Sequence, residues 1–299
     1  MLLPILAAVG SAIALAIGTH QQAKAARLNA AEISLRRRGW LVLLTQPRWL
    51  IGLLIQLVAI ALSVWALSRA PLTIVQPIGA LSLVVTTLLN SWDQKMKLPA
   101  ATWWGSTLAV AGSLGFVFVA IGAVHQDQVV TVTQETKTIV TALALAVFSL
   151  ALYLVYRKNP HALLLVVISG ILYGFVAVLI RVLMLRVDFG APDWWQKLPW
   201  LLILTLLVTA GFGWFLVQQA YLHGPPDLVI AGLTVIDPMV GVLIGIILLN
   251  ELKVTTLSMA HVGMVVLAAV AIVGVFVLAK SHPQMARVAP VGNKETQAK

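Results

Sequence analysis

The stretch LTIVQP, at Leu72–Pro77, returns as LTVIDP at Leu233–Pro238, and each copy lies within a strongly apolar segment. Leu, Thr and Pro are identical in both copies, and two further positions exchange Ile and Val. The remaining position holds Gln76 in the first copy and Asp237 in the second. Proline weakens a helix and a carboxylate is costly in apolar surroundings. We therefore interpret the recurrence as a sign of two related halves.

Composition indicates a membrane protein. Of the 299 residues, 60% are hydrophobic and 10% are charged, and the mean hydropathy is +0.97. Soluble domains carry about 25% charged residues. The basic residues that produce the net charge of +10 stand in short gaps between apolar runs, which is typical of membrane proteins and argues against nucleic acid as a partner. The absence of cysteine excludes disulfides, thiolate metal sites and thiol catalysis.

Apolar runs of about 20 residues are long enough to cross a bilayer as helices. They predict an all-α polytopic protein with a single transmembrane domain over residues 1–280 and a disordered tail over 281–299. We expect the first run to be a true span, because a positively charged region typical of a signal peptide does not precede it. The nine predicted spans are 2–22, 48–68, 71–91, 100–122, 138–156, 162–183, 199–221, 228–250 and 257–279.

The Lys and Arg residues predict the orientation. If the spans alternate in direction, most basic residues fall on one side, which the positive-inside rule assigns to the cytoplasm. The N-terminus is then outside the cytoplasmic membrane, and the tail is cytoplasmic. The spans that hold the two copies of the repeat run in opposite directions. We therefore predict an inverted repeat of residues 1–122 and 162–279, joined by a linker helix at 138–156.

Two longer stretches resemble motifs of the drug/metabolite transporter superfamily. They are APLTIVQPIGALSLVVTTLL at Ala70–Leu89, and DPMVGVLIGIILLNE at Asp237–Glu251, which is similar to an EamA-type pattern. The resemblance is strongest to the NIPA-like magnesium-transporter branch and covers most of residues 1–280. It implies a bundle of about nine helices around a cavity lined by the first, third, fourth, sixth, eighth and ninth spans. The chain departs from the family pattern at Ser91, where glutamate is common, and it lacks a tenth helix.

Asp237 is the main candidate for a coupling residue, because it is the one acidic residue deep within a predicted span. A carboxylate there is expected to face the bundle interior or a wet cavity. Pro238 frees a backbone carbonyl one turn earlier. Two interpretations remain open: a proton- or cation-sensitive gating group, or a hydrogen-bonded structural residue at a kink. Gln76 and Pro77 are the matching candidates in the first half, although Gln76 cannot titrate.

Amphipathic residues in the second half are further candidates for substrate contact. Tyr173 lies in the sixth predicted span, and Trp214 and Gln218 lie in the seventh. Trp214 and Gln218 are four residues apart and share one helix face, whereas Phe215 and Gln219 share another. Only one of these two faces can point inward.

Charged residues near the predicted outer ends of spans complete the candidate set. They are Arg69, Arg181 and Glu251. Such side chains ordinarily extend to the lipid headgroups. The alternative interpretation places Arg181 at the rim of an outer vestibule that attracts an anion.

Motifs for catalysis, ATP binding or dinucleotide binding do not appear, and the histidines lack metal-ligand spacing. We therefore expect no enzymatic activity, no cofactor and no metal centre. The leading hypothesis is a proton- or cation-coupled secondary transporter of a small metabolite or of an amphipathic, lipid-linked substrate. The alternatives are a magnesium transporter of NIPA-like type and a non-transporting scaffold. The expected partners are the substrate and membrane lipids, and the chain is expected to be a monomer or a homodimer.

Overall fold

The computed structural model describes residues 1–28, 45–94, 98–124, 129–158, 161–188, 191–223, 226–252 and 258–280. Within these residues the regular elements are helices, and the extended pairing is an isolated bridge between Val124 and Leu252. The predicted all-α class is confirmed. The helices are α1 (Leu2–Leu28), α4 (Pro47–Arg69), α5 (Leu72–Gly79), α6 (Leu81–Gln94), α7 (Ala100–Ala123), α8 (Val132–Tyr156), α9 (Ala162–Arg186), α10 (Trp200–His223), α11 (Pro226–Ile247) and α12 (Ser258–Lys280).

The helices are long and apolar enough for a multi-pass membrane protein. Among the described residues, 8 stretches satisfy the length and hydropathy needed to cross a bilayer, and α11 contributes a shorter apolar stretch at Gly232–Ile247. The predicted spans correspond to these helices, with shifts at their ends. The largest shifts are of six residues: α1 ends at Leu28 rather than at residue 22, and α8 begins at Val132 rather than at residue 138. The predicted tail, 281–299, lies outside the described residues.

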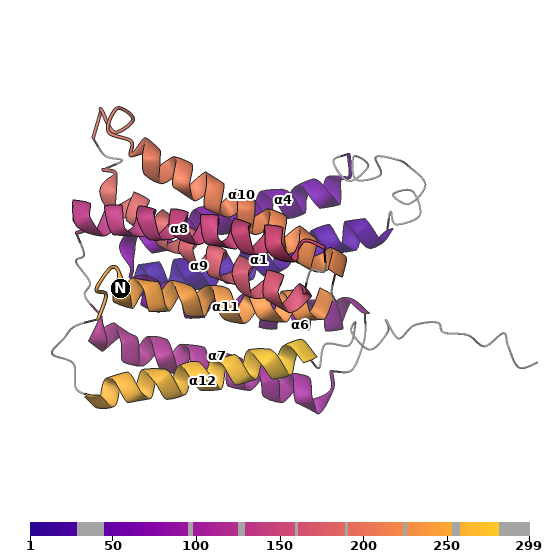
Figure 1. The fold of residues 1–299 in the computed structure, drawn as a ribbon. Helices are drawn as coiled ribbons and strands as arrows, with labels where there is room; N and C mark the ends of the chain where they lie inside the picture. The colour runs from indigo at the N-terminus through magenta and orange to yellow at the C-terminus, as the bar shows by residue number, and fades with distance from the viewer. Residues whose placement is uncertain are drawn as a thin grey trace, which may run out of the picture.

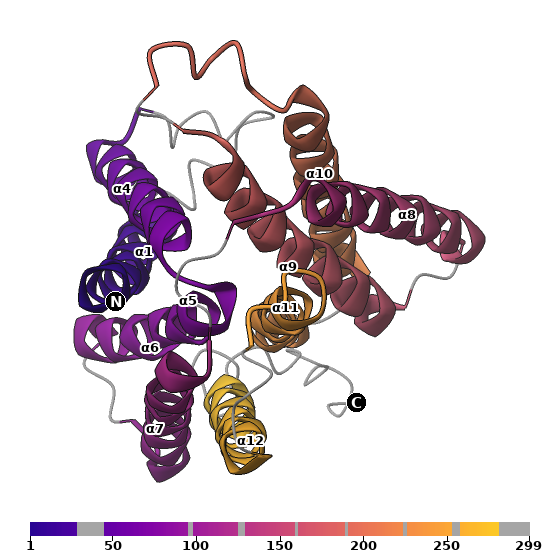
Figure 2. The same ribbon diagram turned by 90° about the vertical axis from the view of Figure 1, so that its left-hand side faces the viewer.

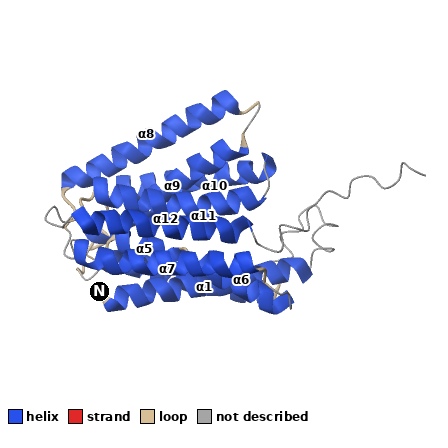
Figure 3. Ribbon diagram, turned by 90° about the horizontal axis from the view of Figure 1, so that it is seen from below, coloured by secondary structure: helices blue, strands red, loops and turns tan. Residues whose placement is uncertain are grey.

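The helices lie side by side with their axes roughly along one direction (Figure 1). α1 packs on α4, α7 packs on α12, and α9 packs on both α10 and α11. α8 lies at the edge of the bundle against α9 and α10, as Figures 2 and 3 both show. α5 lies centrally and contacts α1, α7 and α11. The short helix that carries the first copy of the repeat is therefore surrounded by both halves of the chain.

Small residues let α7 and α12 approach closely. A Cβ added at Gly112 of α7 would lie 2.4 Å from the main-chain nitrogen of Ala271 in α12. A Cβ added at Gly274 of α12 would lie 2.2 Å from the nitrogen of Ala109 in α7. Close backbone approach of this kind stabilises helix pairs in lipid, where burial of apolar side chains gives little preference for protein over lipid.

The two repeated prolines have different effects on their helices. Pro77 lies within α5, which ends two residues later at Gly79, and the chain turns at Ala80 before α6 begins at Leu81. Pro238 also lies inside a helix, but α11 continues through it to Ile247. The predicted span 71–91 is therefore two helices rather than one. The predicted span 228–250 is a single helix followed by a turn.

Candidate functional site

The two copies of the repeat pack directly against each other. A Cβ added at Gly241 of α11 would lie 2.8 Å from Nε2 of Gln76 in α5, and one added at Gly245 would lie 3.2 Å from Cβ of Leu72. Rising residue numbers in α5 therefore meet falling numbers in α11, so the two helices run antiparallel. Asp237 stands one turn before Gly241 on the same face of α11. By this register it is level with the end of α5.

Asp237 is half-buried in this seam. Its Oδ1 atom is buried and has no hydrogen-bond partner among the described residues. Its main chain packs closely against α9, because a Cβ added at Gly174 would lie 3.0 Å from the Asp237 carbonyl oxygen. The sequence left a hydrogen-bonded structural role for Asp237 open, and Oδ1 makes no such bond among the described residues. A buried carboxylate oxygen without a protein partner is available to a proton, a cation or water.

A cavity of about 420 Å³ adjoins this seam and is lined by both repeated prolines, Pro77 and Pro238. Its walls come from α5, α7, α11 and α12, and the described residues that line it are apolar apart from Ser113, Thr234 and His261. These walls are four of the six spans that the family resemblance implies around a central cavity. Asp237 and Gln76 do not line the cavity. The side chains of Asp237 and Gln76 therefore have different surroundings from the two prolines that follow them.

Glu251 forms a second polar site, which links α11 to the start of α5. The Glu251 carboxylate is fully buried and accepts hydrogen bonds from the nitrogens of Leu72 at 2.8 Å and Thr73 at 2.9 Å. The Thr73 hydroxyl donates to the same carboxylate at 2.6 Å. Because the first N–H groups of a helix lack partners within it and carry partial positive charge, a carboxylate is well suited to this position.

The turn after α11 directs Glu251 to this position. The Glu251 nitrogen donates to the carbonyl of Gly245 at 3.1 Å, and Asn250 adopts a left-handed conformation with φ of 53°. Asn tolerates this conformation better than most residues with a side chain. A Cβ at Gly245 would lie 2.8 Å from Oε2 of Glu251, so the glycine leaves room for the carboxylate.

Arg181 belongs to the same region. It is almost fully buried, donates through Nη1 to the carbonyl of Leu67 near the end of α4, and interacts electrostatically with Glu251. The predicted extension of Arg181 and Glu251 to the headgroups is wrong, and so is the placement of Arg181 at an open rim. Instead of reaching water, Arg181 binds a main-chain carbonyl near the end of α4, and Glu251 binds main-chain nitrogens at the start of α5. Arg69 does remain exposed, with its guanidinium 5.9 Å from the ring of Trp65. We call Leu72, Thr73, Arg181 and Glu251 the Glu251 cluster.

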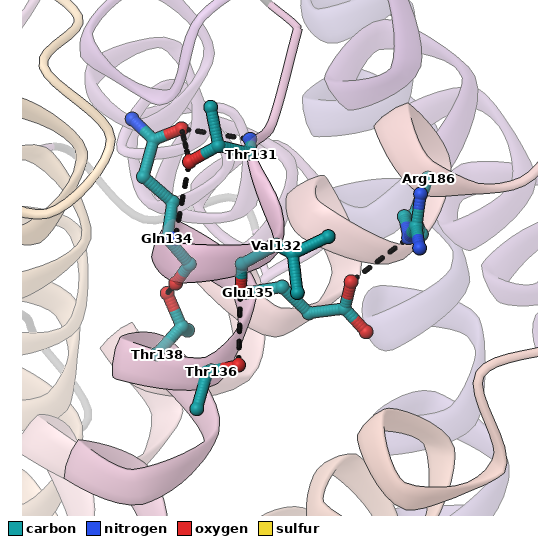
Figure 4. Close-up of polar contacts among 7 residues, drawn as sticks. All are labelled: Thr131, Val132, Gln134, Glu135, Thr136, Thr138 and Arg186. Carbon is teal, nitrogen blue, oxygen red and sulfur yellow. Dashed lines mark hydrogen bonds and ion pairs between the residues drawn. The ribbon is translucent and has the colours of Figure 1, made fainter.

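Polar contacts fix the start of the linker helix α8, and Figure 4 shows those that Thr131, Gln134, Glu135 and Arg186 make. Thr131 caps α8, accepting from the Gln134 nitrogen at 3.2 Å, while the Thr131 nitrogen donates to Gln134 Oε1 at 2.9 Å. Glu135 pairs with Arg186 at the end of α9 at 2.9 Å. Gln134 Nε2 also donates to the Leu249 carbonyl at 3.2 Å, in the turn that follows α11. These contacts hold α8, α9 and α11 together at one end of the bundle.

A second carboxylate fixes the opposite end of the α5–α6 segment. Asp93, near the end of α6, forms an ion pair with Lys24 of α1. The Asp93 carboxylate also lies 4.0 Å from Nε2 of His20 in α1. The segment Leu72–Gln94 is thus held at its start by Glu251 and near its end by Lys24 and His20.

The remaining predicted residues are not brought to the cavity or to Asp237. Trp214 and Gln218 are exposed on the outer face of α10, so this face does not point inward. Phe215 points inward instead, with its ring centroid 5.3 Å from that of Tyr153 in α8. Tyr173 faces α10, where a Cβ added at Gly213 would lie 3.8 Å from its Cζ. Whether a side chain of α10 points toward the bundle or away from it depends on which neighbouring helix covers that face. The sequence of α10 alone does not determine this.

Comparison with known proteins identifies the family. The family described as Magnesium transporter NIPA matches residues 1–284. A protein of Corynebacterium glutamicum described as uncharacterized is 26% identical over 300 residues, which cover 98% of each chain. The probable magnesium transporter NIPA9 of Arabidopsis thaliana is 23% identical over 217 residues, which cover 68% of this chain and 61% of that protein. No solved structure matches. The match over nearly the whole length confirms the resemblance seen in the sequence, and the chain belongs to the magnesium transporter NIPA family of multi-pass membrane proteins.

Proposed function

We propose that this member of a transporter family moves Mg²⁺ across the membrane, with Asp237 as the group that the cation meets within the bilayer. The observation that carries the proposal is the buried Oδ1 of Asp237, which lacks a partner among the described residues. Ionisable residues inside membrane spans characteristically mark ion pathways. The relative described as a probable magnesium transporter favours this cation.

The chemistry of the α5–α11 seam suits a partly hydrated cation. Mg²⁺ usually keeps several water ligands and takes only one or two carboxylates from a protein. The Gln76 side chain packs against Gly241, one turn from Asp237 on the same face of α11. In addition, Pro77 and Pro238 lack a main-chain N–H and cannot donate a hydrogen bond to the carbonyls one turn before them. Asp237 would supply the charge, and neutral oxygens nearby would supply further ligands.

The packing of the helices supports alternating access between two halves. The pairs α1–α4 and α9–α10 occupy corresponding places in the predicted repeat, as do the pairs α1–α6 and α9–α11. The pair α7–α12 joins the last helices of the two halves. Exchanging the predicted halves therefore preserves these neighbours, as an inverted repeat would require. Rocking of the halves would alter the seam between α5 and α11, where the copies of the repeat meet.

The apolar cavity favours a second candidate function, the transport of a small metabolite or an amphipathic substrate. Its volume of about 420 Å³ falls within the usual range for small-molecule pockets, roughly 300–1,000 Å³. The cavity lining offers few ligands for a cation. We therefore assign the Mg²⁺ site to Asp237 and not to the cavity.

The test uses purified protein in liposomes that contain a fluorescent Mg²⁺ indicator. We expect the wild type to raise internal Mg²⁺ faster than protein-free liposomes do, and we expect Asp237→Asn to reduce the rate at least about tenfold. Asp193→Asn is the matched control, because Asp193 is a partly exposed loop residue paired with Lys197, and such pairs contribute about 0–1 kcal/mol.

The outcomes separate the candidates. A wild-type rate equal to that of empty liposomes would overturn Mg²⁺ transport. Transport of a metabolite or lipid-linked substrate by the same liposomes would then support the second candidate, and transport of neither would favour a scaffold. Equal Mg²⁺ rates for wild type and Asp237→Asn would remove Asp237 from the cation pathway. If only uphill accumulation is lost in Asp237→Asn, its role is in coupling rather than passage.

A further inference from the structure

We propose that the cavity between α11 and α12 binds an acyl chain of a membrane phospholipid, which enters sideways from the bilayer. The cavity reaches the outer surface of the protein. Three of its lining side chains are also exposed there: Met239 (41%) and Leu243 (51%) on α11, and Val265 (70%) on α12. In a multi-pass membrane protein this apolar surface faces lipid hydrocarbon, so the cavity is continuous with the acyl-chain region of the bilayer.

The shape of the cavity suits a chain better than a compact solute. Its lining on α11 extends from Thr234 to Ile246, a separation of 12 positions, or about 18 Å at 1.5 Å per residue. Its lining on α12 extends from His261 to Val275, a separation of 14 positions, or about 21 Å. The space is therefore elongated along the helices, in the direction that acyl chains take within a bilayer.

The chemistry of the lining leads to the same occupant. Among the described residues that line the cavity there is no Asp, Glu, Lys or Arg, and the few polar side chains are those of Ser113, Thr234 and His261. Water is poorly held in an apolar cavity because it needs several polar partners. Met239 and Met264 also contribute, and their unbranched side chains adapt to an irregular apolar ligand. An acyl chain loses no hydrogen bonds on entering.

A lipid chain in this cavity would lie against both copies of the repeated sequence. Pro77 and Pro238 both line the cavity, so a bound acyl chain would contact the end of α5 and the middle of α11 at once. Bilayer lipid would then influence the segments whose seam holds Gln76 and Asp237. The proposal rests on the cavity and its opening, so it does not depend on which substrate is transported.

The experiment uses the full-length protein in phosphatidylcholine liposomes that contain a small fraction of phosphatidylcholine with a diazirine in one acyl chain. After photolysis, labelled peptides are mapped by mass spectrometry. We expect the lining residues of α11 and α12 to be labelled several-fold more than Leu54 of α4 and Phe148 of α8, which are each 62% exposed. Diluting the probe with unmodified phosphatidylcholine should reduce this excess in a saturable way.

Substitutions that fill the cavity provide the decisive comparison. Ala268→Phe should remove the excess labelling, because Ala268 lines the cavity. Val266→Phe is the matched control, since Val266 lies on the same helix, is 54% exposed and does not line the cavity. Ala269→Phe is a second filling variant at an exposed lining position, where folding tolerates a larger side chain more easily.

Three results would overturn the proposal. The first is equal labelling of all exposed apolar faces. The second is excess labelling that persists in whichever of Ala268→Phe and Ala269→Phe are folded, as judged by gel filtration and circular dichroism. The third is cross-linking between two copies of the chain at this face, which would mean that a second copy, and not lipid, covers the cavity.

Discussion

Replacing Thr73 by Val should destabilise the protein by removing one hydrogen bond to a buried carboxylate. Thr73 is fully buried, and its hydroxyl lies 2.6 Å from Oε2 of Glu251. Val has nearly the same shape as Thr, so the substitution removes the donor without opening a large space. Hydrogen bonds to charged groups contribute about 1.5–3 kcal/mol. We expect a loss in this range, since the nitrogens of Leu72 and Thr73 still bind the carboxylate.

The measurement is the free energy of unfolding in mixed micelles, from titration with a denaturing detergent. Thr205→Val is the matched control, because Thr205 is also buried but donates to the carbonyl of Leu201 within its own helix at 2.7 Å. A neutral bond of this kind contributes about 0.5–1.5 kcal/mol. Thr73→Ser should retain most of the stability, because it keeps the hydroxyl and loses only a methyl group, worth about 0.8 kcal/mol.

The reasoning fails if Thr73→Val costs no more than Thr205→Val. It also fails if Thr73→Ser and Thr73→Val are equally unstable, because the lost methyl group and not the hydroxyl would then account for the effect. Either result would mean that Glu251 does not depend on Thr73 for its stabilisation at the start of α5.

Two further predictions concern packing and topology. Gly112→Ala should reduce stability more than Gly241→Ala, because the new Cβ at Gly112 meets the main chain of α12 whereas that at Gly241 meets the movable end of Gln76; equal unfolding free energies would contradict this. Cysteines introduced at Ser34 and Ser281, which lie outside the described residues, should both resist an impermeant thiol reagent on intact cells and react after permeabilisation. The chain has no native cysteine, so labelling of either site from outside would contradict an external N-terminus with a cytoplasmic tail.

Local sequence was sufficient to predict the class of the protein and the positions of its helices. Helix length must match the thickness of the bilayer, and hydropathy reports this directly along the chain. The same pattern located Asp237, because a carboxylate stands out wherever its neighbours are apolar. The two copies of the repeat also predicted antiparallel segments, and in the structure α5 and α11 run antiparallel in direct contact.

The tertiary structure decided which polar residues are buried and what they bind. Glu251 binds the start of α5 across 179 positions of sequence, and Arg181 is enclosed because the end of α4 supplies a carbonyl for it. Both residues stood near predicted helix ends, where extension to the headgroups was the ordinary expectation. On α10, the structure exposes Trp214 and turns Phe215 inward. A membrane helix can be equally apolar toward lipid and toward protein, so its composition does not reveal which face a neighbouring helix covers.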